Sequence, residues 1–176
     1  MGAASSPNPA ARKDGAAAAR QCLAFLLGAE TFAIEIRSIK EVVQYGNLTP
    51  VPLMPAFIRG VLNLRGVVVP VLDLGVRFGR EPTAVTQRTC VVILELDQGG
   101  GPVVLGVLVD HVKAVLDIAE ADIEPAPSFG STLRADFIAG IGKADGAFVI
   151  LLDVDHVLAV EELAALTATA EREPGP

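Results

Sequence analysis

Two stretches of this chain, eighty residues apart, repeat one pattern of apolar residues, glycines and an aspartate. Between residues 57–74 and 137–154, seven of eighteen positions are identical. The identities pair Phe57 with Phe137, Ile58 with Ile138, Gly60 with Gly140, Gly66 with Gly146, Val69 with Val149, Leu72 with Leu152 and Asp73 with Asp153. Chance similarity between apolar strands does not account for matched glycines and an aspartate. The sequence therefore predicts a duplicated structural unit.

The repeat continues upstream of these two stretches at slightly smaller offsets. Residues 32–36 align with 105–109, 39–42 with 112–115, and 50–52 with 125–127, at offsets of 73, 73 and 75 residues. The offset changes only between segments, as duplication followed by insertions in loops would produce. The duplicated segments therefore run over about 32–74 and 105–154.

Pairs of short apolar segments flank turn residues, which is the pattern of β-hairpins. The expected hairpins join 23–27 to 32–36, 61–64 to 67–72, 91–96 to 103–109, and 138–141 to 148–152. Four or five short strands in each unit indicate a small barrel, and closure of a barrel removes exposed strand edges. We therefore predict a mostly β fold. One helical turn is expected at 74–78 and one longer C-terminal helix over 155–172.

The ends of the chain differ from this body. Residues 1–20 are rich in alanine, serine and proline without an apolar period, which predicts a disordered N-terminal tail and not a signal peptide. The folded domain is expected over 21–166, with 167–176 as a flexible C-terminal end. No apolar run approaches the ~20 residues of a membrane span. Without an export signal, Cys22 and Cys90 are expected to be reduced cysteines of a cytoplasmic protein.

Charge is distributed unevenly along the chain. The net charge of -7 argues against nucleic acid as a partner. Residues 56–90 hold five arginines against two acidic residues, for a net of +3, whereas residues 91–176 hold four basic and fifteen acidic residues, for a net of -11. This asymmetry reflects either solubility alone or two faces that steer different partners.

The sequence offers no set of residues for catalysis or metal binding. His111 and His156 have no second histidine or cysteine at metal-ligand spacing. Neither cysteine lies in a motif that activates a nucleophile. We therefore expect no enzyme activity, no cofactor and no metal.

Positions where the two copies differ are candidates for function, because the shared positions already account for the core. Glu41 in the first copy aligns with Ala114, and Arg65 aligns with Asp145. The segments that carry Glu41 and Arg65 are expected to lie side by side. The competing interpretations are a capping box of Ser38 with Glu41 and an ordinary solvated turn residue at Arg65.

Several colinear motifs carry a resemblance to a known family. They include Pro-Ala-Phe-Ile-Arg-Gly at 55–60, Val-Leu-Asn-Leu-Arg-Gly at 61–66, and the segments 25–28, 32–36, 40–42, 50–52, 70–74, 106–110, 125–127 and 137–142. Over about residues 21–163 the chain resembles the CheW family of chemotaxis coupling proteins. The resemblance implies two intertwined SH3-like five-stranded barrels with a hydrophobic interface. It also implies a non-catalytic cytoplasmic adaptor, peripheral to membrane receptor arrays, that does not insert into the membrane.

The resemblance further implies partners and sites. The partners are the cytoplasmic tip of a methyl-accepting chemoreceptor and the regulatory domain of a CheA-like histidine kinase, which has the same fold. Carried over by position, the receptor-binding residues are Ile39, Glu41, Arg65 and Val115, and the kinase-binding region includes Gly60. Two departures from the family pattern, His111 and the segment 144–147, lie in the second copy and bear on its contacts more than on the fold.

Three alternatives remain beside a chemotaxis adaptor. One is an adaptor of a chemotaxis-like pathway that controls surface motility or another output. Another is the regulatory end of a kinase or receiver-containing protein, which the short chain argues against. The last is a small-molecule-binding barrel or a cryptic enzyme, which would need a large polar pocket between the barrels, and the sequence gives no sign of one.

Overall fold

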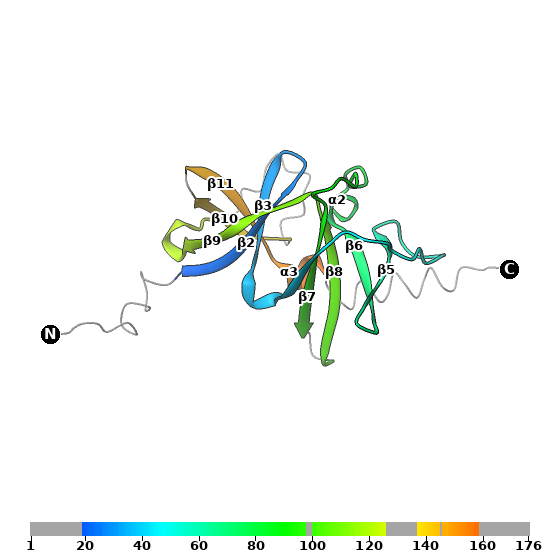
Figure 1. Ribbon diagram of the computed structural model, residues 1–176. Coiled ribbons are helices and arrows are strands. Elements are labelled where there is room, and N and C mark those ends of the chain that lie inside the picture. The colour runs from blue at the N-terminus through cyan, green and yellow to red at the C-terminus, as the bar shows by residue number, and fades with distance from the viewer. Residues whose placement is uncertain (1–18, 98–99, 126–136, 145, 159–176) are drawn as a thin grey trace.

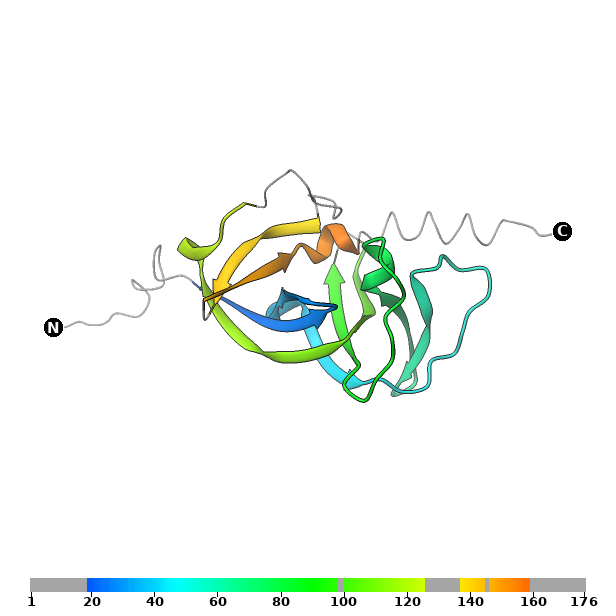
Figure 2. The same cartoon turned by 90° about the horizontal axis from the view of Figure 1, so that it is seen from above.

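Two five-stranded sheets, each curled into a small barrel, make up the body of the molecule (Figure 1). The computed structural model describes residues 19–97, 100–125, 137–144 and 146–158. The first barrel has the strand order β10 (Ile138–Ala144), β11 (Ala147–Leu152), β3 (Glu30–Glu35), β2 (Ala19–Leu27), β9 (His111–Ala119). The second barrel has the order β4 (Ile39–Gln44), β7 (Cys90–Asp97), β8 (Pro102–Val109), β6 (Val67–Asp73), β5 (Ile58–Leu64). Viewed from above, the two barrels lie side by side (Figure 2). The predicted mostly β fold with two SH3-like barrels is confirmed.

The two repeats exchange strands. Strands β2 to β6 form the first repeat and β7 to β11 the second, yet each barrel contains strands of both. Strand β11 pairs in parallel with β3, where Ile150 faces Phe32, and β6 pairs in parallel with β8, where Val71 faces Gly106. The remaining neighbours in each sheet pair antiparallel. The barrels are therefore intertwined, and neither repeat can close a barrel alone.

Local irregularities recur at equivalent places in the two repeats. The strand register shifts between Ile58 and Gly60 in β5 and between the equivalent Ile138 and Gly140 in β10. It also shifts between Ile39 and Glu41 in β4 and between the equivalent Val112 and Ala114 in β9, which pair with the adjacent residues Phe25 and Ala24. Isolated bridges join Thr49 to Val61 and Glu124 to Ile141. Because β-bulges are specific local features, their recurrence supports the duplication and extends it to β2 and β7.

The predicted elements agree with the structure except at their ends and at two strands. All four hairpins are present, and α2 (Leu74–Arg77) is the expected helical turn. Strands β4 and β9 were not among the predicted hairpin strands. β2 begins at Ala19, so the last two residues of the expected tail belong to a strand. Helix α3 (Val154–Val157) begins the predicted C-terminal helix one residue early, and residues 159–172 of that prediction lie outside the described residues.

Two short 3-10 turns complete the framework. η2 (Ile36–Ser38) links β3 to β4, and η3 (Glu120–Asp122) follows β9. Within the described ranges, no helix is long and apolar enough to cross a membrane.

The core is continuous between the barrels. One cluster of buried side chains takes residues from both sheets, including Phe25 and Phe32 of the first barrel and Val92 and Leu94 of the second. Four phenylalanine rings run through it: the centroids of Phe25 and Phe32 are 6.2 Å apart, those of Phe32 and Phe78 are 5.6 Å apart, and those of Phe78 and Phe137 are 6.0 Å apart. These separations are typical of favourable aromatic contacts. The hydrophobic interface that the family resemblance implies is therefore present.

Arg77 joins the two repeats by contacting residues of both. Its guanidinium carbon lies 5.3 Å from the ring centroid of Phe57 and 4.9 Å from that of Phe137, which occupy equivalent positions. Its Nε donates a hydrogen bond to the carbonyl oxygen of Val157 at 3.0 Å, and Val157 is the equivalent of Arg77 itself. Cation–π contacts of this kind stabilise by about 0.5–2 kcal/mol each.

A fully buried carboxylate organises one end of the second barrel. Asp73 Oδ2 accepts hydrogen bonds from Arg59 Nη1 at 2.7 Å and from the Thr83 amide at 2.9 Å. Its Oδ1 accepts from Thr83 Oγ1 at 2.8 Å, the Gly75 amide at 2.9 Å and the Val76 amide at 3.4 Å. A buried charge is stable only when it is paired and hydrogen-bonded, and here every donor comes from α2, the following loop or the bulge at Arg59.

Replacing Asp73 with alanine should therefore lower the free energy of unfolding by about 3–5 kcal/mol, because it leaves Arg59 without its buried partner. Asp153 provides the matched control. It caps α3 as Asp73 caps α2, but its side chain is 33% exposed, so its replacement with alanine should cost only about 1 kcal/mol. Urea unfolding of the two variants measures the difference. Equal losses would show that the buried network contributes nothing beyond helix capping.

Candidate functional site

Glu41 and Arg65 form an ion pair on the second barrel. Strands β4 and β5 stand at opposite ends of the sheet order, and curling of the sheet brings β4 close to the β5–β6 turn. There Arg65 Nη2 donates to Glu41 Oε2. The Arg65 side chain is 69% exposed and that of Glu41 is 27% exposed. The prediction that these segments lie side by side is confirmed. The capping-box interpretation is wrong, because Glu41 lies in β4 and not in a helix.

The backbone at Arg65 adopts a conformation that is unfavourable for its residue type. Arg65 has a φ of 51° and Gly66 a φ of 88°, so both residues of the two-residue turn are left-handed. This geometry matches the twist of a hairpin and favours asparagine, aspartate or glycine. Asn63 Oδ1 stabilises the turn by accepting from the Gly66 amide at 2.8 Å. An arginine held in a left-handed turn position suggests that its side chain has a use beyond the turn.

Exposed apolar side chains follow this turn directly. Val67 and Val68 are exposed at the start of β6, whereas the next residue, Val69, is fully buried. We call the group of Glu41, Arg65, Val67 and Val68 the Glu41–Arg65 surface. Arginine beside exposed apolar residues is a combination enriched at protein–protein interfaces. The sequence placed these valines in a strand but did not show that both side chains are exposed.

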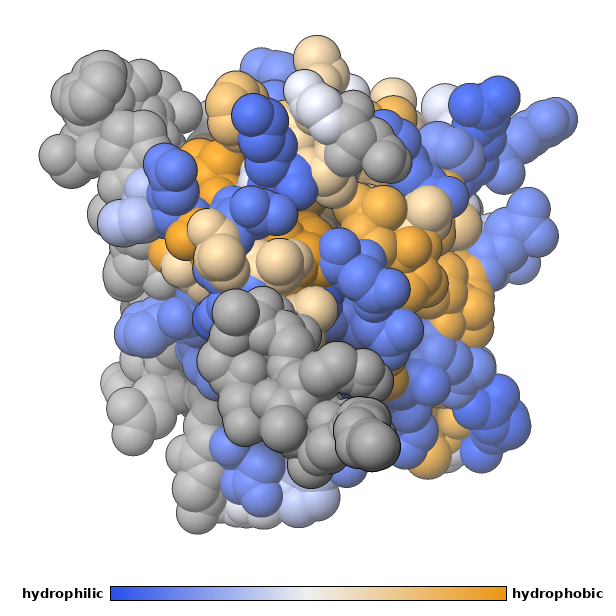
Figure 3. Space-filling view, turned by 90° about the vertical axis from the view of Figure 1, so that its left-hand side faces the viewer, coloured by the Kyte–Doolittle hydropathy of each residue, from blue (hydrophilic) through white to orange (hydrophobic). Residues whose placement is uncertain are grey.

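The other two predicted receptor-binding residues lie apart from this surface. Ile39 begins β4, is half-buried and packs against the core shared by the barrels. Val115 lies on β9 opposite Leu23 and is 53% exposed, but it belongs to the first barrel. The side of the molecule that lies at the left in Figure 1 exposes hydrophobic residues between hydrophilic ones (Figure 3). The structure therefore brings Glu41 and Arg65 together and places Val115 on the other barrel.

Gly60, the predicted kinase-binding residue, is buried at the bulge of β5 with a φ of 153°. A Cβ atom there would lie 2.6 Å from the carbonyl oxygen of Thr49. That oxygen accepts from the Val61 amide at 2.9 Å, so the backbones approach closely. Gly140 is equally crowded, since a Cβ there would lie 2.6 Å from Ile123 Cγ2. Because both repeats need the glycine, its direct role is to let two segments meet.

The arginines of residues 56–90 are mostly engaged within the chain. Arg59 pairs with Asp73, Arg65 with Glu41 and Arg80 with Glu30, while Arg77 stacks between Phe57 and Phe137. This segment therefore does not present a face of free basic side chains, and its local excess of charge serves the fold and the Glu41–Arg65 surface.

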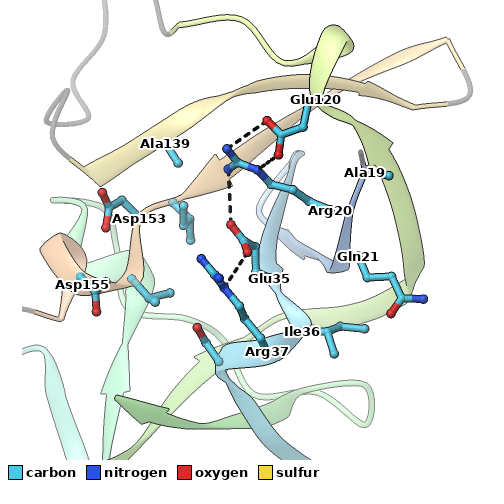
Figure 4. A pocket seen from close by; sticks show the side chains of 13 residues that line it. Ala19, Arg20, Gln21, Glu35, Ile36, Arg37, Glu120, Ala139, Asp153 and Asp155 are labelled. Carbon is cyan, nitrogen blue, oxygen red and sulfur yellow. Dashed lines mark hydrogen bonds and ion pairs between the residues drawn. The ribbon is translucent and has the colours of Figure 1, made fainter. Parts of the chain in front are cut away.

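A polar pocket of about 730 Å³ opens at one end of the first barrel (Figure 4). It was not expected from the sequence, and it lies within the first barrel and not between the barrels. Its lining includes Arg20, Glu35, Arg37, Ala139 and Asp153. In the described part of the chain, no three histidine, cysteine or acidic side chains are grouped so that they could hold a metal ion.

Burial makes the nearby thiol of Cys22 a poor nucleophile. Removal from water, together with the charge of Glu35, raises the pKa of Cys22 to about 11. Because the thiolate is the reactive form, this cysteine stays protonated near neutral pH and acts as a core residue.

Comparison with known proteins agrees with the fold and the motifs. A family profile described as CheW-like domain matches residues 21–162. The chain is 36% identical to Chemotaxis protein CheW of Klebsiella aerogenes over 152 residues, which cover 86% of this chain and 89% of that protein. It is 34% identical to Protein FrzA of Myxococcus xanthus over 122 residues, which cover 69% and 73% of the two chains.

A solved structure is also similar. The crystal structure of scaffolding protein TtCheW from Thermoanaerobacter tengcongensis superposes with a TM-score of 0.71 at 32% identity, covering 80% of this chain and 88% of that one. The chain therefore belongs to the CheW family of chemotaxis scaffold proteins.

Proposed function

We propose that this chain is a non-catalytic scaffold that couples transmembrane chemoreceptors to a CheA-type histidine kinase in chemotaxis signalling. The observation that supports this most is the Glu41–Arg65 pair at an exposed turn. The fold does not require the pair, because the other repeat builds the same strands with Ala114 in place of Glu41 and Asp145 in place of Arg65. Because only the first repeat carries this charged pair and the fold forms without it in the second, the pair is better explained by recognition of a partner.

The Glu41–Arg65 surface is the proposed receptor-binding site, and its partner is the cytoplasmic tip of a methyl-accepting chemoreceptor. Arg65 presents a planar guanidinium with donors in a fixed geometry. Glu41 fixes the direction of that group while leaving most of it in solvent. An exposed ion pair contributes only about 0–1 kcal/mol to stability, so selection for the pair is better explained by binding.

Ile39 and Val115 contribute to receptor binding in different ways. Ile39 is half-buried and holds β4, which carries Glu41. Val115 offers an exposed apolar side chain from the first barrel, so a receptor that touches both Val115 and Arg65 must extend across both barrels.

The proposed kinase-binding region surrounds Gly60, and its partner is the regulatory domain of the kinase. Gly60 acts by fixing the loop at residues 45–57, through the bridge between Thr49 and Val61. Because that regulatory domain shares this fold in the CheW family resemblance, adaptor and kinase domains would alternate barrel against barrel. The proposal places the protein in the cytoplasm at the membrane receptor array, without nucleic acid, cofactor or membrane insertion.

A second candidate is an adaptor of a chemotaxis-like pathway with another output, such as surface motility. The likeness to Protein FrzA favours it, because that relative is not named for chemotaxis. Identifying the kinase and receptor that the chain binds in its own cell separates the two candidates.

Charge reversal at Arg65 tests the receptor-binding site. The Arg65→Glu variant should weaken co-sedimentation with receptor-containing membranes and kinase at least about tenfold, which corresponds to about 1.4 kcal/mol. Its melting temperature should stay within a few degrees of the parent, because the pair is exposed. The double swap Glu41→Arg with Arg65→Glu separates pairing from direct contact. Recovery of binding in the swap would mean that the pair only orders the turn.

Arg65→Asn is the matched control for this turn. Asparagine fits the left-handed conformation better than arginine, so this variant should be at least as stable as the parent while binding the receptor less. Unchanged assembly in both Arg65 variants would refute the proposed site.

Replacement of Gly60 with alanine tests whether this residue acts through the fold. The added Cβ meets the Thr49 carbonyl oxygen in a strained backbone conformation, so the free energy of unfolding should fall by about 2 kcal/mol or more. Gly46→Ala is the control, since a Cβ there meets nothing within 4 Å. Kinase binding, measured by calorimetry well below the melting temperature, should weaken for Gly60→Ala only. A stable Gly60→Ala protein that fails to bind kinase would instead indicate direct contact at Gly60.

A further inference from the structure

The loop between β4 and β5 holds an exposed leucine in an unfavourable backbone conformation. Leu53 has a φ of 63° and is 64% exposed. Leucine is rare in this left-handed region, because its Cβ crowds the backbone there, and glycine, asparagine and aspartate are favoured instead. Among the described residues, Leu53 and Arg65 are the two non-glycine residues with a positive φ. An exposed side chain held against the preference of its own backbone suggests a role in binding.

Prolines on both sides leave Leu53 as the residue at which the chain can turn. Pro50, Pro52 and Pro55 have fixed φ angles, and the residue before each proline is restricted to extended conformations. Leu53 is the one residue of 49–55 that is neither a proline nor followed by one. The position therefore requires a left-handed residue, but glycine or asparagine would fit it with less strain. The shape of the loop explains the φ angle and does not explain the apolar side chain.

The loop is anchored on both sides of Leu53. Thr49 and Val61 exchange two backbone hydrogen bonds, both of 2.9 Å. The Ile58 amide donates to the carbonyl oxygen of Pro55, also at 2.9 Å. Because the conformation is formed before a partner arrives, little conformational entropy is lost when the leucine is buried in a complex.

The surface of this loop is neutral and apolar. No charged residue occurs between Glu41 and Arg59, although residues 45–57 contain neither a helix nor a strand. Loops of this length are uncommon in compact domains and are often functional. The loop projects from the second barrel on the side away from the first (Figure 2). A partner that covers it must therefore offer an apolar surface, and binding here should not depend on charge.

This loop adjoins the proposed kinase-binding region. A Cβ at Gly60 would meet the Thr49 carbonyl oxygen at 2.6 Å, so the glycine allows the loop to pack against β5. Gly60 is itself buried and has no side chain to offer a partner. A contact residue is therefore needed nearby, and Leu53 is exposed in the segment that Gly60 positions.

We propose that Leu53 is the side chain by which this loop binds the regulatory domain of the kinase, and that it inserts into an apolar pocket of that domain. The inference rests on the proposed function, from which it takes the partner, and it adds the contact residue and the chemistry of the contact. Burial of the leucine in the complex removes its apolar surface from water. This gain explains why a position that favours asparagine holds a leucine.

Replacement of Leu53 with asparagine separates binding from stability. Asparagine fits the left-handed conformation better, so the melting temperature of the full chain should rise by about 2 °C. The affinity for the kinase regulatory domain, measured by calorimetry, should fall about tenfold or more. A lower melting temperature would show that the leucine packs within the chain, and it would overturn the inference.

Two further variants serve as controls. Leu53→Met keeps an apolar side chain of similar size in the same strained turn, so its kinase affinity should stay within about threefold of the parent. Val85 is 45% exposed in the loop between α2 and β7, and Val85→Asn should leave kinase binding unchanged. A loss of affinity in Val85→Asn equal to that in Leu53→Asn would refute a specific contact at Leu53.

Salt dependence distinguishes this contact from the Glu41–Arg65 surface. Between about 0.1 and 1 M salt, the loss of kinase affinity caused by Leu53→Asn should stay constant, because an apolar contact is not screened. The loss of receptor binding caused by Arg65→Glu should shrink over the same range. An effect of Leu53→Asn that disappears at high salt would contradict an apolar pocket.

The same titrations separate this inference from the proposed function. If the parent chain does not bind the kinase domain, both fail. If the parent and Leu53→Asn bind it equally well, only the inference fails. Sedimentation of the parent alone tests a second copy of the chain as the occupant. Self-association that Leu53→Asn abolishes would assign the leucine to that copy, and the kinase would be the wrong partner.

Discussion

Strand pairing between the two repeats holds the structure together: β2 pairs with β9 and β4 with β7 in antiparallel fashion, while β11 pairs with β3 and β6 with β8 in parallel, so each barrel is closed by strands of both repeats. Each parallel pairing spans only a few residues, so its backbone hydrogen bonds alone contribute little. Its effect is to bring the apolar faces of the two repeats into one core, through which the phenylalanine rings run. Separating the repeats would expose that core and break four strand pairings at once, which favours a single cooperative unit.

Strand exchange also distributes equivalent positions over different barrels. Glu41 on β4 lies in the second barrel, while its counterpart Ala114 on β9 lies in the first. Each barrel therefore offers the same backbone with different side chains. Since the same bulges and bridges form on both sides, the differing side chains are not needed for folding. The ion pair at Arg65 and the pocket lined by Ala139 are such differences, and they occur on opposite barrels.

Hairpins, barrels and the helical turn at α2 could be predicted because each depends on local pattern: apolar alternation, turn residues and matched glycines. The adjacency of Glu41 and Arg65 could be predicted because both stand beside hairpin segments. Strands β4 and β9 were missed because they are half-exposed and carry charged residues such as Lys40 and Lys113, which weaken the apolar signal.

Other features could not be predicted because they depend on three-dimensional closure. The buried pair of Arg59 and Asp73 requires a bulge that turns Arg59 inward, and the sequence shows only two charged residues fourteen positions apart. Val115 could not be assigned to a barrel without knowledge of the strand exchange. The pocket of the first barrel is harder still, since its lining comes from β2, η2, η3, β10 and α3, which lie far apart in the sequence.

The contrast between Asp73 and Asp153 follows from where the covering loop can exist. A carboxylate can be buried only if donors surround it completely, and in the second barrel the loop after α2 supplies Thr83 for that purpose. The loop is possible there because α2 leads into β7, at the junction of the repeats. In the first barrel the corresponding strand, β2, precedes all the others, so no loop can lead from α3 into it. The side chain of Asp153 is 33% exposed there and accepts hydrogen bonds from the amide and Nδ1 of His156. Duplication with strand exchange thus places the same aspartate in a fully buried network in one barrel and in a partly exposed helix cap in the other.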